Sequence, residues 1–218
     1  VVDLADMKAL ELPFWMAGDY ATPERIKEVK DLGAHGIQVG TLFAFCETSG
    51  VDPKLRISKL ERIVSQPMPE GGWVFTDPRS SPTGFPFKAV KLHDSVSQTS
   101  VYEKRSRICD LGYLRHAYKK EDGSVGQRCP AEPVKDDLKK GGLEEDTVGR
   151  KCLCNALFAD IGMPQVQFGN EIEVHLLTAG DDLNKVLRVM KKDSVTGQFN
   201  LRYTARDVLV HLLGEEKV

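Results

Sequence analysis

The chain has 218 residues, of which 41% are hydrophobic and 28% are charged, a balance typical of an ordinary globular protein. Its formal net charge of -2 removes the electrostatic basis for a general binder of nucleic acid or of membrane surfaces. No apolar run approaches the length of a membrane span, and nothing at the N-terminus reads as a signal peptide. Five cysteines without a dense spacing framework favour reduced thiols or metal ligands, so we expect a cytoplasmic protein.

The first part of the chain predicts a β–α–β unit behind an opening helix over residues 4–10. Residues 12–16 form a short apolar run with the length of a buried parallel strand. Thr22 is suited to cap the following helix, and Gly33 is suited to end it. Residues 36–39 then predict the second strand.

Loops of small residues follow both expected strands, at Gly18 and at Gly40. Glycine lets a backbone N–H approach an anion closely, and the N-terminus of a following helix adds partial positive charge. Two such loops after neighbouring parallel strands bind one phosphate in (β/α)8 barrels. The alternative is an ordinary strand-to-helix turn in which glycine serves geometry alone, and the pattern by itself leaves both readings open.

These stretches resemble the nitronate monooxygenase family, FMN-dependent (β/α)8-barrel flavoenzymes once called 2-nitropropane dioxygenases. The similarity rests on Ala17-Gly18 and on residues 33–41 (GAHGIQVGT), and longer members are matched by residues 46–50, 76–86 and 149–155. Asp19 stands where the family usually has a second glycine. The resemblance implies that the FMN site is formed by Gly18, Asp19, Gln38, Val39, Gly40 and Thr41, with the Thr41 hydroxyl as an additional donor to the phosphate.

For the fold, the resemblance implies an α/β protein: the C-terminal part of a (β/α)8 barrel, a turn-rich extension that bears cysteines, and C-terminal helices. The expected segments are the last βα units, a proline-rich return segment, the cysteine-bearing extension and a helical segment, at residues 1–64, 65–93, 94–165 and 166–218. The family's earlier strands and the histidine loop that carries its catalytic base have no counterpart here. The resemblance therefore implies that this chain is the C-terminal portion of a longer family member, that the N-terminal barrel half is missing here, and that this chain alone has no turnover.

The activity implied is FMN-dependent oxidation of a small-molecule nitronate with O2, giving a carbonyl compound and nitrite. No catalytic residue is assigned within the chain, and no nucleic-acid or membrane partner is expected. Two alternatives stay open. One is an FMN-dependent enoyl-thioester reductase of the same barrel family. The other is a non-catalytic interaction module ordered by a metal.

The proline-rich segment is expected to contain two short strands, over residues 72–76 and 87–92. Asp77, at the turn between them, is suited to cap Arg79 or Ser80 locally, as Asp-Pro turns do. A phosphate-binding reading of Arg79 and Ser80 is the alternative, and we favour the local turn.

Four cysteines lie in the turn-rich region around a predicted hairpin over residues 118–127. Four thiolates brought together would bind zinc or an iron–sulfur cluster. Their spacing is irregular, so four independent reduced thiols are the alternative, although the segment has few large apolar residues to order it. The candidate ligands are Cys109, Cys129, Cys152 and Cys154, with His116 as a substitute.

The C-terminal section predicts a strand or a helix at residues 173–177 and an amphipathic helix at residues 183–190. Thr204 with Asp207 forms the pattern of a helix-capping box ahead of an apolar run. Cys46 is expected to be a small buried hydrophobic residue rather than a reactive thiol.

Overall fold

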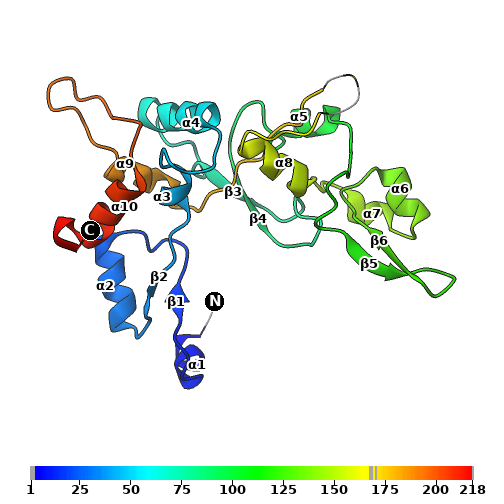
Figure 1. Cartoon of the computed structure of the whole chain (residues 1–218), viewed down its shortest axis with the longest axis horizontal. Helices are drawn as coiled ribbons and strands as arrows, with labels where there is room; N and C mark the ends of the chain where they lie inside the picture. The colour runs from blue at the N-terminus through cyan, green and yellow to red at the C-terminus, as the bar shows by residue number, and fades with distance from the viewer. Residues whose placement is uncertain (1–2, 167–168, 170, 218) are drawn as a thin grey trace. The chain divides into compact units, whose positions relative to one another are not determined.

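The computed structural model describes residues 3–166, 169 and 171–217, which divide into two compact units (Figure 1). Unit 1 comprises Val1–Trp73 and Ala179–Val218, and unit 2 comprises Val74–Thr178. The strands assigned among the described residues form three two-stranded sheets, so the expected barrel stays a prediction. Within the same residues, no helix combines the length and the apolar character needed to cross a bilayer.

Unit 1 begins with α1 (Leu4–Ala9), followed by a β–α–β unit made of β1 (Trp15–Met16), α2 (Pro23–Asp31) and β2 (Gly36–Ile37). The two strands pair in parallel, as the sequence predicts, with Trp15 opposite Gly36 and Met16 opposite Ile37. The strands are shorter than the apolar runs that encode them, and the pair packs over a small core of Phe14, Val29 and Ala34.

Local signals set the ends of α2. The Thr22 side chain accepts a hydrogen bond from the backbone N–H of Arg25 at 3.3 Å, and Pro23 occupies the first turn, where its missing N–H costs nothing. Gly33 follows the C-cap residue Leu32 with a φ of +88°, a conformation that favours glycine. The predicted cap and terminator are therefore confirmed.

The other elements assigned to the described part of unit 1 are helices, and α10 (Ala205–Leu213) lies against α2, α3 (Thr41–Ala44) and α9 (Val186–Val189) (Figure 1). Asp52 caps α4 by accepting from the N–H groups of Lys54 and Leu55, each at 3.0 Å. The elements are α3 (Thr41–Ala44), α4 (Pro53–Ser65), the 3-10 turn η2 (Leu183–Lys185), α9 (Val186–Val189), α10 (Ala205–Leu213) and η3 (Glu215–Lys217). Cys46 is buried, as predicted.

The capping box of α10 is present as predicted. The Thr204 hydroxyl accepts from the Asp207 N–H at 3.2 Å, and the Asp207 carboxylate accepts from the Thr204 N–H at 2.8 Å. We expect Thr204→Ala to lower the free energy of unfolding by about 1 kcal/mol, because the Asp207 N–H loses the hydroxyl that accepts its hydrogen bond. Urea denaturation checks this. Arg206→Ala, an exposed change in the same turn, should have a smaller effect, and equal losses in both variants would contradict the prediction.

Unit 2 contains two antiparallel strand pairs, both at the predicted places. These are β3 (Val74–Asp77) with β4 (Phe87–Val90), and β5 (His116–Lys119) with β6 (Val125–Arg128). Val74 lies opposite Val90, and His116 lies opposite Arg128. The helices are α5 (Thr99–Lys104), α6 (Val134–Lys139), α7 (Glu144–Thr147) and α8 (Leu153–Asp160). The buried core is formed by Ala89, Val96, Leu153, Ala156 and Leu176.

The turn after β3 has the predicted local structure. The Asp77 carboxylate accepts from the N–H groups of Arg79 at 2.9 Å and Ser80 at 3.1 Å. Lys151, which the local pattern did not indicate, donates to the same carboxylate at 2.7 Å. Burial raises the pKa of Asp77, but these hydrogen bonds outweigh it and the pKa is lowered overall.

Residues 173–177 are neither the helix nor the strand that the sequence predicts. Their carbonyl groups bond to backbone outside any regular ladder: Leu177 accepts from the Val90 N–H at 2.8 Å, and His175 accepts from the Val96 N–H at 3.2 Å. Tertiary packing therefore buries the apolar residues of this segment. Their pattern in the sequence resembles that of a helix or strand, although no regular element forms.

Candidate functional site

The candidate phosphate site lies where β1 and β2 end. Gly18 follows β1 with a φ of +104°, a left-handed conformation that residues with a Cβ rarely adopt. The Gln38 N–H donates to the Met16 carbonyl at 2.8 Å, and Gly40 is the N-cap residue of α3. Because β1 and β2 are parallel, their carboxyl ends and the loops that follow lie at the same edge.

Both loops border open space. A Cβ added at Gly18 or at Gly40 would meet no other heavy atom within 4 Å. Asp19 and Gln38 are also exposed, and Val39 is half-buried. Gly18, Asp19, Gln38 and Gly40 are therefore exposed at this edge, and the expected FMN site stays a prediction.

The sixth residue, Thr41, is buried. Its hydroxyl donates to the Asp182 carboxylate at 2.9 Å and accepts from the Gly180 N–H at 2.9 Å. A hydroxyl has one proton to donate. In this structure the hydroxyl proton is directed at Asp182, and the expected role of the Thr41 hydroxyl as a donor to phosphate stays a prediction. The backbone N–H of Thr41 lies at the first residue of α3, a position that has no partner within the helix.

Gly180 makes this buried arrangement sterically possible. A Cβ at Gly180 would lie 2.5 Å from the Asp182 Oδ1 atom, closer than real contacts allow, and 3.0 Å from the Thr41 Oγ1 atom, tighter than most. Thr41 and Asp182 are 141 residues apart. No local pattern marks their contact, which is why sequence reasoning did not identify Gly180 and Asp182 as supports of the second loop.

Asp19, the departure from the family pattern, forms an ion pair. The Lys185 Nζ atom lies 2.5 Å from the Asp19 Oδ1 atom and also donates to the Asp19 carbonyl at 3.0 Å. A carboxylate alone would repel a phosphate, whereas the paired ammonium offsets its charge. Lys185 lies in η2, far along the chain from Asp19, so it was missed from sequence.

The cysteines of unit 2 influence each other's pKa in two pairs, the first being Cys109 with Cys129. The hydrogen bond from the Cys129 thiol lowers the pKa of Cys109 to about 6, and Arg115 acts in the same direction. The same bond, together with burial, raises the pKa of Cys129. Cys109 is half-buried and Cys129 is buried.

The second pair joins Cys152, the N-cap residue of α8, to Cys154 in the first turn of that helix. The hydrogen bond from the Cys152 thiol lowers the pKa of Cys154 to about 6, while the same bond and burial raise the pKa of Cys152. The charge of Cys154 also contributes to raising the pKa of Cys129, so the two pairs lie within electrostatic reach of each other.

The pKa shifts therefore link Cys109 with Cys129 and Cys152 with Cys154, and the predicted four-cysteine metal site stays a prediction. Throughout the described ranges, no three histidine, cysteine, aspartate or glutamate side chains already have the arrangement of a metal site. His116, the predicted substitute ligand, is exposed on β5.

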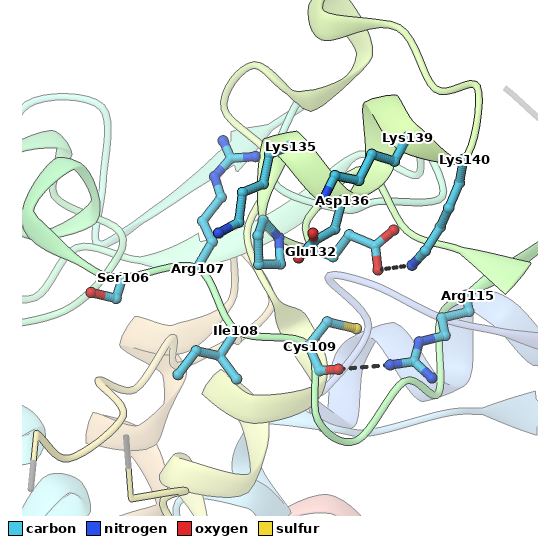
Figure 2. A pocket seen from close by; sticks show the side chains of 11 residues that line it. Ser106, Arg107, Ile108, Cys109, Arg115, Glu132, Lys135, Asp136, Lys139 and Lys140 are labelled. Carbon is cyan, nitrogen blue, oxygen red and sulfur yellow. Dashed lines mark hydrogen bonds and ion pairs between the residues drawn. The ribbon is translucent and has the colours of Figure 1, made fainter. Parts of the chain in front are cut away.

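A cavity of about 590 Å³ opens beside Cys109 (Figure 2). The Arg115 guanidinium donates to the Cys109 carbonyl at 2.7 Å, and the Lys140 Nζ atom lies 2.7 Å from the Glu132 Oε2 atom. Cationic side chains outnumber acidic ones in the lining, which includes Arg107, Arg115, Lys135, Lys139, Lys140, Glu132 and Asp136. The Cys109 side of unit 2 is thus electropositive, which favours a thiolate over a thiol.

Comparison with known proteins assigns no family to the chain, because no family model, no curated protein and no solved structure matches it.

Proposed function

We propose that this chain supplies the phosphate-binding part of an FMN site in a flavin-dependent oxidoreductase that resembles nitronate monooxygenases. The observation that supports this proposal is the parallel β1–α2–β2 unit, which has an open glycine loop after each strand at the same edge. The FMN residues expected from the resemblance are the residues of these two loops.

The role of this chain is to bind and orient the phosphate. Gly18 and Asp19 would present backbone N–H groups from the first loop, and Gly40 and Thr41 would present them from the second. Lys185 would limit the repulsion between Asp19 and the phosphate. FMN, when bound, supplies the electron transfer from a nitronate substrate to O2.

The proposal predicts that Gly40→Glu weakens FMN binding by at least about tenfold, because a carboxylate would enter the space assigned to the phosphate. The fold should tolerate the change, since a Cβ at Gly40 meets nothing within 4 Å. Titration of FMN fluorescence measures the affinity, and circular dichroism verifies the fold.

Val195→Glu is the matched control. It adds the same charge to unit 1 at a residue that is 91% exposed, and it should leave the affinity for FMN unchanged. Riboflavin, which lacks the phosphate, should bind the unmodified chain more weakly than FMN. The proposal fails if the chain binds no FMN, if riboflavin binds equally well, or if Gly40→Glu behaves like the control.

A further inference from the structure

Unit 2 contains a second cavity, of about 250 Å³, whose lining includes none of the cysteines and none of the expected FMN residues. Charged side chains of both signs line it: Arg128 and Arg150 are cationic, Asp137 and Asp146 are acidic, and His116 adds an imidazole. Within the described part of the chain, no ion pair joins either arginine to either aspartate. Opposite charges therefore share one small cavity without neutralising each other directly.

Asp137, in α6, is the buried member of this group, with only 2% of its surface exposed. Among the residues that the structure describes, its buried Oδ1 atom has no hydrogen-bond partner. A Cβ at Gly142 would lie 1.8 Å from the Asp137 Oδ2 atom, so glycine at this position is what admits the carboxylate. Burial raises the pKa of Asp137, as expected of a carboxylate that lacks a paired cation. A ligand that donates to this carboxylate would offset the cost of its burial.

The two arginines are held in place by backbone carbonyl groups. Arg128 donates from Nη1 to the Lys140 carbonyl at 2.7 Å. Arg150 donates from Nη1 to the Ser81 carbonyl at 2.6 Å and from Nε to the Asp146 carbonyl at 3.0 Å. A guanidinium has five N–H donors, so the Nη2 group of each arginine remains to donate to a ligand. The cations of this cavity are thus positioned before a ligand arrives, which lowers the entropy cost of binding.

We propose that this cavity binds a small zwitterion, a free α-amino acid, whose ammonium group donates to the Asp137 carboxylate and whose carboxylate accepts from Arg128 and Arg150. Two arginines and two aspartates balance in charge, which suits a ligand without net charge better than an anion. Guanidinium groups are well matched to a carboxylate, and a buried carboxylate is well matched to an ammonium.

The size of the cavity also fits a ligand of this class. Pockets for drug-sized ligands are about 300–1,000 Å³, so 250 Å³ suits a smaller molecule. A single water, which takes about 30 Å³ in the liquid, would fill only a fraction of it. The proposal is independent of the FMN site, since that site belongs to unit 1 and this cavity belongs to unit 2.

Isothermal titration calorimetry on the full chain tests the proposal, with the common amino acids added one at a time. We expect at least one of them to bind. Acetate, which has only the carboxylate, and methylamine, which has only the ammonium, should each bind at least about tenfold more weakly, because each makes only one of the two charged contacts. These comparisons use the unmodified chain, so they do not depend on whether a variant folds.

Asp137→Asn keeps the shape of the side chain and removes its charge, and it should weaken amino-acid binding at least about tenfold. Asp136→Asn, the same change at the preceding residue of α6, is the matched control. Asp136 does not line this cavity, so the control should bind as the unmodified chain does. Circular dichroism verifies the fold of both variants.

Four results would each overturn the proposal. The first is that no amino acid binds. The second is that acetate or methylamine binds as tightly as the best amino acid. The third is that inorganic phosphate binds more tightly than any amino acid, which would make the cavity an anion site. The fourth is equal affinity in the folded Asp137→Asn and Asp136→Asn variants.

Discussion

Glu173→Gln should destabilise unit 2 by about 3–5 kcal/mol, the typical cost of breaking a buried ion pair. The Arg105 guanidinium donates two parallel hydrogen bonds to the Glu173 carboxylate, from Nε to Oε1 at 2.5 Å and from Nη2 to Oε2 at 2.6 Å. The two side chains are only 7% and 0% exposed. The glutamine variant would leave the Arg105 charge buried without its counter-charge, and water could not compensate.

Amide hydrogen exchange, read on peptides of unit 2 by mass spectrometry, measures this loss locally. Glu171→Gln makes the same chemical change at an exposed neighbour and should change protection little. The double variant Arg105→Met with Glu173→Leu should recover part of the loss, because it removes both charges and retains apolar volume. If Glu173→Gln and Glu171→Gln lose equal protection, the ion pair does not stabilise this unit.

Asp160→Asn should remove a strong pH dependence of stability. Asp160, the last residue of α8, is 4% exposed, and burial raises its pKa to about 8 against the opposing hydrogen bond from the Leu176 N–H. The folded state then holds a proton between about pH 4 and pH 8 that the unfolded state has released. Stability should therefore fall as the pH rises through that window, by on the order of a few kcal/mol in total, and should then level off.

Urea denaturation at pH 5 and at pH 8 measures this effect. The unmodified chain should be less stable at pH 8 by the contribution of Asp160, whereas Asp160→Asn should lose most of the difference because an amide does not ionise. Asp146→Asn, at an exposed site in unit 2, should keep the pH dependence of the unmodified chain. If stability depends on pH equally in Asp160→Asn and in the unmodified chain, ionisation of Asp160 does not lower the stability of the folded state.

Short-range chemistry was readable from the sequence. The caps at Thr22 and Thr204 and the turn at Asp77 depend on a side chain and on backbone groups two or three residues away. The two antiparallel pairs and the parallel β1–β2 pair also follow from strand length and turn residues. The same signals failed at residues 173–177, where apolar side chains are buried by tertiary contacts without a regular element.

Contacts between distant parts of the chain were settled by the tertiary structure alone. The Asp182 carboxylate accepts a hydrogen bond from the Thr41 hydroxyl 141 residues away, and Glu173 pairs with Arg105 68 residues away. A hydrogen bond or ion pair of this kind leaves no periodic or spacing pattern, since its geometry depends on how whole segments pack. Residue patterns were enough to place the local elements and the two glycine loops, because these depend on neighbours within a few residues. The ion pair of Lys185 with Asp19 and the hydrogen bond of Thr41 with Asp182 follow from the packing of distant segments, which no local pattern encodes.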